Sequence, residues 1–381
     1  ALSLPCPALA SPAAVLPVGR RPHTARSRSL LATAQAPLHG SAREEGYYYV
    51  EVGLGTPPQP FELIMDTGST MAFVPCKSCG SACGSHADAA FDPAASTTSE
   101  ALACSSGLCA QAGGHCSSGS CHYVRSYAEG SSTSGEMMRD ELHLPGLPPS
   151  PVAFGCETRE TGMIKAQVAD GIMGLGKDGI AVPDQLAAAG AVAKQFSLCY
   201  GDFDGGGTLV LGELPGDPAS DWGIGWTPFQ HRGTASYYSV SLESLEVGET
   251  AVGGSRVRAA LSAGYGVVLD SGSTFSYLHQ DVFRPFLAAV EAQAAHNGAS
   301  KVAGPDPRYP DDVCYTKPGL SVESAADVFP SVKYSFEGGL EVDLPPKNYL
   351  FIHTSNAEAL CVGVFSNYRS GSMLGGVFAR D

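Results

Sequence analysis

The chain has no long uninterrupted apolar run, since no stretch of about 18 apolar residues occurs in its 381 positions. A helix that crosses a bilayer needs about 20 such residues, so this sequence predicts no membrane span. Charged residues are also few, at 16% against 44% apolar residues. This balance is typical of a globular protein, and the length is sufficient for two substantial cores.

Positive charge is scarce, with 23 Lys and Arg against 38 Asp and Glu and a net charge of −15. Five arginines lie in residues 1–43, which contain no acidic residue, so the remainder carries about −20. Such a body repels nucleic acid and anionic membranes. Neither is expected as a partner, and a solubilising acidic surface is favoured over a dedicated cationic partner.

Residues 1–45 lack an initiator Met, so the amino end is expected to be incomplete. Prolines at positions 5, 7 and 12 interrupt the apolar stretch, which makes a poor signal-peptide core, and the Arg- and Ser-containing composition also resembles a transit peptide. We interpret residues 1–45 as a targeting or pro-segment remnant that is disordered in isolation. The secretory pathway, extracellular or vacuolar, is the expected location, and the chloroplast is the alternative.

Cysteine is concentrated in one place, because seven of the twelve lie between Cys76 and Cys121. This density indicates an oxidising compartment and a disulfide framework that holds a loop with little core of its own. A zinc cluster is the alternative interpretation of the spacing Cys76-x2-Cys79-x3-Cys83-x2-His86. Disulfides are favoured because the remaining cysteines repeat no CxxC pair and no second His cluster accompanies them.

Two apolar segments each deliver one aspartate into a glycine-containing turn. FELIM at 61–65 precedes DTGST at 66–70, and GVVL at 266–269 precedes DSGST at 270–274. A buried carboxylate is costly unless donors surround it, and the hydroxyls and backbone N–H groups of such a turn supply them. A lone Asp in a turn is usually structural, but two equivalent ones favour a catalytic role.

A second repeated feature is a glycine-punctuated apolar segment, DGIMGLG at 170–176 and SMLGG at 372–376. Its central glycine follows the aspartate by 108 residues in the first copy and by 105 in the second. The chain therefore contains two copies of one lobe. A pseudo-symmetric pair of lobes would bring Asp66 and Asp270 together at their junction, where binding clefts tend to lie.

Many glycines, prolines and β-branched or aromatic residues predict short strands and turns, so the expected fold is dominated by β-structure with few short helices. The expected domains are an N-terminal lobe at 46–195, with a cysteine-rich insert at 76–121, and a C-terminal lobe at 196–381. A short helix is expected at 182–193, with Pro183 at its start and Gly190 near its end, and a longer one at 281–296, where an apolar face repeats at helical spacing.

The segment 122–135 predicts a hairpin with a polar tip, and Tyr127 stands just before that tip. This tyrosine could lean over a cleft between the lobes. A packing pair of tyrosines across the two strands is the alternative.

Two facing carboxyl groups share one proton, because both cannot ionise comfortably at short distance. The ionised member can take a proton from a water held between them, while the protonated member hydrogen-bonds an amide carbonyl. Such a pair activates water against a peptide bond without a metal or other cofactor, so none is expected.

These motifs carry a resemblance to a known family. The two aspartate turns, DGIMGLG and the Tyr127 hairpin resemble the pepsin-like aspartic proteases. The closer resemblance is to plant and algal members with a cysteine-rich insert, the nepenthesin-like group. It extends along nearly all of residues 46–381 through the segments VPCKSCGSACGSHADAAFDPAAST, CSSGLC, FGCE, FSLCY and LCVGVF.

The resemblance implies a bilobal β fold with a long substrate cleft, and an endopeptidase that acts on proteins and peptides at acidic pH. It assigns the catalytic pair to Asp66 and Asp270 and the flap tyrosine to Tyr127. It implies a monomer without cofactor. Asp170 matches a structural position, and Phe73 stands where pepsin has a tryptophan that hydrogen-bonds the flap tyrosine, so flap positioning must differ here.

The remaining positions of the two turns match residues that support the pair. Ser69 and Ser273 match positions that hydrogen-bond the outer oxygens of the aspartates. Thr67 and Ser271 match hydroxyls that brace the two turns against each other, with Gly68 and Gly272 between.

The resemblance also suggests disulfides Cys314–Cys361 and, more weakly, Cys156–Cys199. Eleven cysteines outside the leader are an odd number, and relatives usually have another near the carboxyl end, so the chain is expected to be truncated there, with a later membrane anchor still possible. Two rivals remain: a phosphotransferase of the actin and sugar-kinase type, disfavoured by the cysteine cluster, and a catalytically silent binding or inhibitor protein.

Overall fold

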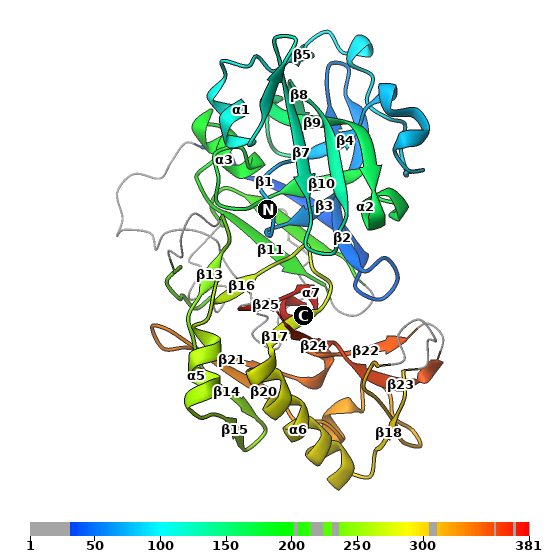
Figure 1. Cartoon of the computed structure of the whole chain (residues 1–381), viewed down its shortest axis with the longest axis vertical. Helices are drawn as coiled ribbons and strands as arrows, with labels where there is room; N and C mark the ends of the chain where they lie inside the picture. Colours follow the sequence, from blue (N-terminus) through cyan, green and yellow to red (C-terminus); the bar gives the residue numbers. More distant parts are fainter. Residues whose placement is uncertain are drawn as a thin grey trace.

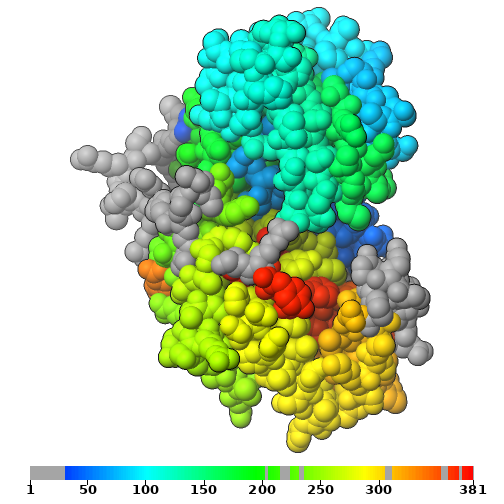
Figure 2. All heavy atoms as spheres, viewed as in Figure 1, coloured from blue at the N-terminus to red at the C-terminus, as the bar shows by residue number. Residues whose placement is uncertain are grey.

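The computed structural model describes residues 31–201, 205–214, 224–230, 236–304, 311–353, 356–368 and 371–380. The chain is mostly β-structure arranged in two lobes, one built from the first half of the sequence and one from the second (Figure 1). In space-filling view the two lobes meet across the middle of the molecule (Figure 2). No helix in the described part of the chain is long and apolar enough to cross a membrane.

The first lobe is organised on one large sheet, with strand order β11-β12-β1-β2-β3-β10-β4-β9-β8-β7-β6 and with β5 paired to β8. Its strands are β1 (Ala34–Ser41), β2 (Tyr47–Leu54), β3 (Gln59–Asp66), β4 (Phe73–Pro75), β5 (Glu100–Ala101), β6 (His115–Ser117), β7 (Ser120–Ser126), β8 (Ser132–His143), β9 (Ser150–Thr161), β10 (Gly171–Gly174), β11 (Phe196–Tyr200) and β12 (Gly207–Leu211). Its helices are η1 (Lys77–Ala82), η2 (Pro93–Ala95), α1 (Gly107–Gln111), α2 (Gly162–Ala166) and α3 (Val182–Ala188).

The second lobe holds one five-stranded sheet, in the order β13-β16-β25-β17-β24, and two four-stranded sheets, β15-β14-β20-β21 and β18-β19-β23-β22. Its strands are β13 (Ser239–Val240), β14 (Leu242–Val247), β15 (Thr250–Val252), β16 (Val267–Leu269), β17 (Ser276–His279), β18 (Ser300–Val302), β19 (Cys314–Thr316), β20 (Val332–Phe336), β21 (Leu340–Leu344), β22 (Leu350–His353), β23 (Asn356–Val362), β24 (Val364–Asn367) and β25 (Ser372–Leu374). Its helices are α5 (Ser255–Leu261), α6 (Gln280–His296), η3 (Ala325–Asp327), η4 (Pro346–Asn348) and α7 (Gly376–Ala379).

The expected helix at 281–296 is α6, which buries Val282, Phe286 and Val290 on one face. The helix expected at 182–193 is α3, and it ends earlier, at Ala188. Gly190 follows with φ of 72°, a left-handed conformation that glycine adopts at little cost and that ends helices.

Strand β1 corrects the expectation that residues up to 45 are disordered. It pairs antiparallel with β2 and with β12, and it buries Ala34, Ala36 and Leu38 on alternate positions. The folded chain therefore begins at residue 34 or earlier and not at Gly46, while residues 1–30 lie outside the described part. The lobe boundary expected at residue 195 is not a sheet boundary either, because β11 and β12 continue the first sheet through β1.

The two lobes repeat the same five-strand arrangement around the aspartate strands. In the first lobe, β10 lies between β3 and β4, parallel to β3 and antiparallel to β4. In the second, β25 lies between β16 and β17 with the same two orientations. The outer partners also correspond, because β4 is parallel to β9 and β17 is parallel to β24. This repeat confirms the two-copy interpretation of the sequence.

Disulfides, and not zinc, hold the cysteine-rich insert. The pairs within it are Cys79–Cys83, Cys104–Cys116 and Cys109–Cys121, and Cys76 is bonded to Cys156. The zinc interpretation is therefore wrong, since three of its four ligands are committed to disulfides.

The predicted Cys156–Cys199 disulfide is wrong because Cys156 is bonded to Cys76. Because β4 pairs in parallel with β9, the Cα atoms of Cys76 and Cys156 lie 4.9 Å apart, which suits a disulfide. Cys199 is also disulfide-bonded. The Cys314–Cys361 disulfide is confirmed, and its two residues face each other on β19 and β23.

Candidate active site

Asp66 is the last residue of β3, and Asp270 follows β16, so each carboxyl group stands where an apolar strand ends. The first turn is tied to its glycine segment by Leu175 N, which donates to Asp66 O at 2.8 Å, and by Gly176 N, which donates to Ser69 O at 2.8 Å. In the second lobe Asp270 N donates to Leu374 O at 2.9 Å and Gly376 N to Ser273 O at 2.7 Å. Each glycine segment therefore holds its turn through two backbone hydrogen bonds, and the bond to the serine carbonyl is the same in both lobes.

The two aspartates come together at the lobe junction, where Asp66 is 6% and Asp270 8% exposed. Each carboxyl group lies against the glycine of the opposite turn. A Cβ atom at Gly68 would lie 2.6 Å from Asp270 Oδ1, and one at Gly272 would lie 2.2 Å from Asp66 Oδ1. No side chain fits at such distances, so glycine at both positions permits the close approach of the two turns.

Reciprocal hydrogen bonds brace the two turns against each other, as the resemblance implied for Thr67 and Ser271. Thr67 Oγ1 donates to Leu269 O at 2.9 Å and accepts from Ser271 N at 2.9 Å. Ser271 Oγ donates to Met65 O at 2.7 Å and accepts from Thr67 N at 3.0 Å. Four hydrogen bonds across the junction therefore fix the distance between the two carboxyl groups.

The donors to the two carboxyl groups are unequal. Asp270 accepts from Gly272 N at 3.0 Å and from Ser273 Oγ at 2.9 Å, whereas Asp66 accepts from Gly68 N at 2.8 Å. The Ser69 hydroxyl is buried and makes no hydrogen bond of good geometry with the described residues, although it lies close enough to Asp66 to lower the pKa of that carboxyl group. The expectation that Ser69 and Ser273 bond their aspartates alike is therefore correct for Ser273 only.

Burial raises the pKa of both aspartates, because it disfavours the charged forms. The nearby charge of Asp270 adds to this effect on Asp66, whose pKa rises to about 7 although Ser69 and Gly68 oppose the rise. For Asp270, Ser273 and Gly272 hold the pKa down, so it is raised mainly by burial. Asp270 accepts two hydrogen bonds and Asp66 accepts one, which favours the charged form on Asp270 and the shared proton on Asp66.

Tyr127 stands at the tip of the hairpin formed by β7 and β8, here called the Tyr127 hairpin, which extends from the first lobe toward the second (Figure 1). Its backbone N–H donates to Ser131 O at 2.9 Å. Burial and the charge of Asp66 raise the pKa of the Tyr127 hydroxyl, so this group lies within electrostatic reach of Asp66. Its ring meets the fully buried Phe73 edge-on, with centroids 6.3 Å apart. Since Phe73 has no N–H group with which to hydrogen-bond Tyr127, an aromatic contact between the two rings positions the tyrosine.

Asp170 lies in a structural position, as the resemblance implied. Its Oδ2 accepts from Glu62 N at 2.6 Å and its Oδ1 from Asp88 N at 2.8 Å. The carboxyl group thus ties the cysteine-rich insert to β3, the strand that ends in Asp66.

Tyr277 is a site residue that the sequence analysis missed. Burial and the charge of Asp270 raise the pKa of its hydroxyl, which therefore lies near Asp270. Its place in the second lobe is that of Phe73 in the first, since each lies opposite the glycine strand, Phe73 facing Ile172 and Tyr277 facing Met373. The signal was available, because both aromatic residues follow their aspartate by seven positions.

A cavity of about 50 Å³ lies beside Asp270. Residues of both lobes line it, among them Thr67, Tyr200, Tyr238, Asp270 and Phe378. The lining is mainly apolar.

Comparison with known proteins agrees with this geometry. Residues 48–213 match the family model described as xylanase inhibitor N-terminal, and residues 237–381 match the model described as xylanase inhibitor C-terminal. Aspartic proteinase nepenthesin-1 of Nepenthes gracilis is 28% identical over 343 residues, which cover 87% of this chain and 73% of that protein. Aspartic proteinase 36 of Arabidopsis thaliana is 27% identical over 372 residues, which cover 91% of this chain and 71% of that protein.

Among solved structures, basic 7S globulin from soybean superposes with a TM-score of 0.69 at 18% identity, covering 92% of this chain and 90% of that one. That likeness shows the fold. Together with the family models and the proteinases, it shows that this chain belongs to the pepsin-like aspartic protease family, in the nepenthesin-like group that carries a cysteine-rich insert.

Proposed function

We propose that the protein is an aspartic endopeptidase that hydrolyses peptide bonds in proteins with water activated between Asp66 and Asp270. The observation that carries this proposal is the meeting of two buried carboxyl groups from opposite lobes, with a raised pKa on each. The aspartic proteinases among its relatives support the same reaction.

In the proposed reaction Asp270, ionised, takes a proton from the water as the water oxygen attacks the peptide carbonyl carbon. Asp66, protonated, donates to the carbonyl oxygen as that oxygen gains charge. The tetrahedral diol then collapses: the C–N bond breaks, the leaving nitrogen takes the proton held by Asp270, and a diol hydroxyl returns a proton to Asp66 as the carbonyl re-forms. Tyr127, whose hydroxyl lies within electrostatic reach of Asp66, is the residue that we propose covers the scissile bond.

The proposed reaction needs one proton on the pair. A raised Asp66 pKa of about 7 keeps that proton in place through mildly acidic pH and releases it above neutrality. Activity is therefore expected to fall as the pH rises through 7, and to fall again at low pH where Asp270 also becomes protonated.

The proposed location is the secretory pathway, with the chloroplast as the alternative. Five disulfides among the described residues suit an oxidising compartment. The proposed partners are protein and peptide substrates, bound by a monomer.

A catalytically silent binding or inhibitor protein is the second candidate. The observation in its favour is that both matching family models are described as xylanase inhibitor domains. The preserved aspartate pair favours the protease, since a silent relative has no need of two buried carboxyl groups at a junction.

Cleavage of haemoglobin at pH 3–5, with and without pepstatin, separates these candidates. The protease predicts pepstatin-sensitive cleavage that falls roughly 10²–10⁴-fold in Asp66→Asn and in Asp270→Asn, while Asp343→Asn, an exposed carboxyl group on β21, retains full activity. Absence of cleavage by the wild type, together with inhibition of a xylanase, would establish the binding protein. Full activity in Asp270→Asn would refute the mechanism.

A further inference from the structure

Beneath the Tyr127 hairpin, a row of polar side chains links the cysteine-rich insert to the two hairpin strands. Its members, here called the polar chain, are His86 from the insert, Glu160 and Glu157 from β9, Thr133 from β8 and Tyr123 from β7. The side chains of His86 and Glu160 are 4% and 0% exposed, and the other three residues are buried as well. None of these residues takes part in the proposed reaction.

Hydrogen bonds connect the members of the polar chain on either side of the Glu157–Glu160 pair. His86 Nε2 lies 3.0 Å from Glu160 Oε2, and Thr133 Oγ1 donates to Glu157 Oε1. Tyr123 OH lies 3.2 Å from Thr133 Oγ1 and acts as the donor, because the Thr133 proton is directed at Glu157.

At the insert end, His86 is fixed through both ring nitrogens. Its Nδ1 lies 3.0 Å from Ala169 O, and a carbonyl can only accept, so Nδ1 carries a proton. Burial lowers the pKa of His86, but the hydrogen bond and charge of Glu160 outweigh burial and raise it. A protonated His86 therefore donates to an ionised Glu160, which also accepts from Gly84 N at 2.9 Å.

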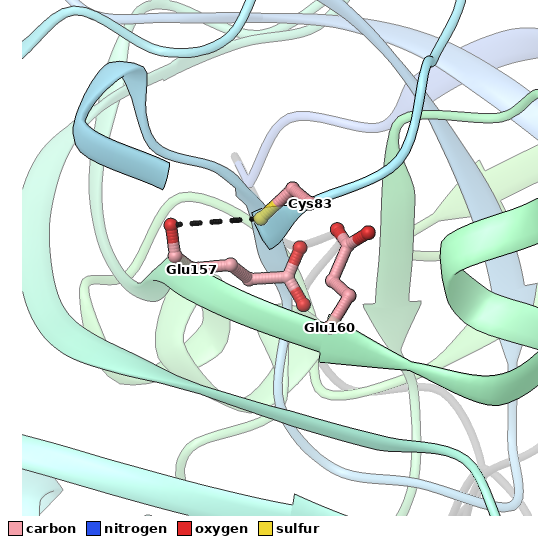
Figure 3. Close-up of side chains that lie close together, drawn as sticks. All are labelled: Cys83, Glu157 and Glu160. Atoms are coloured by element: carbon pink, nitrogen blue, oxygen red, sulfur yellow. Dashed lines mark hydrogen bonds between the residues drawn. The ribbon is translucent and has the colours of Figure 1, made fainter. Parts of the chain in front are cut away.

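In the middle of the polar chain, two carboxyl groups meet without a full set of partners. Glu157 Oε2 and Glu160 Oε1 are buried and have no hydrogen-bond partner among the described residues. Figure 3 shows the two carboxyl groups directed toward each other beside Cys83. One proton held between them satisfies both oxygens. Burial raises the pKa of Glu157 well above its usual range, which assigns that proton to Glu157.

A metal ion is the other way to satisfy these oxygens. Cys83, Glu157 and Glu160 bring one ligand atom each within 4.8 Å of one another. However, the Cys83 sulfur is bonded to Cys79 and is not a thiolate. Two carboxylates alone make a poor site for zinc, which takes four ligands of which nitrogen and sulfur are preferred. The shared proton is therefore the better account of the cluster.

Tyr123, at the base of the hairpin, is also linked to the Phe73–Tyr127 ring contact at its tip. A Cβ atom at Gly155 on β9 would lie 2.5 Å from the Tyr123 ring, so strand and ring are in close contact. Gly155 is in turn the strand partner of Phe73, whose ring meets Tyr127. A shift of Tyr123 is thereby transmitted to the tip of the hairpin.

We propose that His86 is a positioning residue that holds the Tyr127 hairpin over Asp66 through the polar chain. Its effect on catalysis rests on the proposed peptidase function, whereas its effect on the hairpin does not. The cysteine-rich insert thus acts as a support for the hairpin, and removal of the proton between Glu157 and Glu160 releases that support.

This release gives the hairpin a pH dependence. Glu157 faces Glu160 and Tyr123 and lies within electrostatic reach of Tyr127, while His86 faces Glu160 and Asp170. When Glu157 ionises, two negatively charged carboxylates lie side by side in a buried place. Among the described residues only one positive charge, that of protonated His86, lies beside them, so the two carboxylates repel each other. The hairpin is therefore held at acidic pH and loosens as the pH rises through the raised pKa of Glu157.

Hydrogen–deuterium exchange of residues 120–143 in the full chain tests the proposal without reference to activity. In His86→Ala we expect protection factors in the hairpin to fall at least about 10-fold at pH 4, while the exposed His115→Ala of the same insert matches the wild type. In Glu157→Gln, which imitates the protonated form, we expect wild-type protection at pH 4 that no longer declines by pH 7. Unchanged hairpin protection in His86→Ala would overturn the proposal, and so would an undiminished decline in Glu157→Gln.

Treatment with a chelator distinguishes a metal ion at Glu157 and Glu160 from a proton shared between them. If the purified protein holds one equivalent of zinc, and removal of it by EDTA loosens the hairpin, then the cluster is a metal site and the proposal is wrong. If His86→Ala fails to fold, the pH series on wild type and Glu157→Gln still decides between the outcomes.

Kinetics then connects the hairpin to catalysis. In His86→Ala we expect KM for a peptide to rise about 10-fold with a smaller change in kcat, and a steeper loss of activity toward pH 7 than in the wild type. An inactive wild type with the expected exchange pattern would refute the protease and keep the support role. An active wild type, together with hairpin protection that is unchanged in His86→Ala, would support the protease and refute the support role of His86.

Discussion

In the first lobe β10 lies between β3 and β4, and in the second lobe β25 lies between β16 and β17, with the same orientations throughout. Each lobe contributes an aspartate, a glycine that touches the opposite carboxyl group and a hydroxyl that braces the opposite turn. The two halves of the junction are thus built alike from residues about two hundred positions apart.

The lobes differ in what surrounds this shared arrangement. The first lobe adds the cysteine-rich insert and the Tyr127 hairpin, and its Ser69 hydroxyl does not make to Asp66 the well-formed hydrogen bond that Ser273 makes to Asp270. Symmetry therefore brings the two carboxyl groups together, and the asymmetry decides which one holds the proton. Each prediction below changes one lobe and compares it with the other.

The largest effect is expected from a methyl group at either glycine of the turns. Gly68→Ala and Gly272→Ala each place a Cβ atom against the opposite carboxyl group, at 2.6 and 2.2 Å from its Oδ1 atom. Because the turns must separate, we expect kcat/KM to fall at least about 10²-fold in both variants. Gly107→Ala and Gly253→Ala, one in each lobe with nothing within 4 Å, are the controls. A loss in one turn variant only would show that the junction is not symmetric.

A second prediction concerns the pH dependence of stability. Since the pKa of Asp66 is raised from 3.8 to about 7, the folded state binds more protons than the unfolded state between these values. The free energy of unfolding should therefore fall as the pH rises from about 4 to 7, by up to an amount on the order of 4 kcal/mol for this group.

Urea denaturation at a series of pH values measures this slope. Asp66→Asn should flatten it more than Asp270→Asn, because Asp66 holds the shared proton. Equal flattening by the two substitutions would argue against the assignment of that proton.

The disulfides offer a third comparison. Cys76–Cys156 closes 80 residues in the first lobe, and Cys314–Cys361 closes 47 in the second. We expect replacement of either pair by serine to lower the free energy of unfolding by about 2–4 kcal/mol, more for the longer loop. Thermal unfolding of both double variants measures the difference. A larger cost in the second lobe would show that local packing outweighs loop length.

The smallest effect is expected at the two serines. Ser273→Ala removes a hydrogen bond to a carboxylate, which is worth roughly 1.5–3 kcal/mol, so kcat/KM should fall about 10-fold or more. Ser69→Ala removes a hydroxyl that makes no hydrogen bond of good geometry to Asp66, and we expect a smaller change, within about 0.5 kcal/mol. Steady-state kinetics at pH 4 on both variants measures the ratio. Equal losses would show that Ser69 bonds Asp66 once substrate is present.

Much of the site could be predicted because it depends on local pattern. The turns at Asp66 and Asp270 and their glycine segments repeat in sequence, and helix α6 has a strong apolar face. Cys314 and Cys361 were assigned to each other correctly from the resemblance alone.

The features that could not be predicted from the sequence depend on contacts between distant segments. Strand β1 contains Pro37 and Gly40 and has a weak pattern of its own, so it is recognisable only beside β2 and β12. Cys76 pairs with Cys156 because β4 lies along β9, which no spacing reveals. Ser69 and Ser273 occupy the same place in the same motif, so only their surroundings could distinguish them.

Carbon-13 NMR titration of the aspartate carboxyl groups tests most directly whether Asp66 and Asp270 share one proton. We predict that Asp66 titrates near pH 7 in the wild type, with the Asp270 carbon responding in the same step, and that the pKa of Asp66 falls in Asp270→Asn because a like charge has been removed. If Asp66 titrates near pH 4 in both proteins, with no response at Asp270, the two carboxyl groups are independent and the proposed mechanism is wrong.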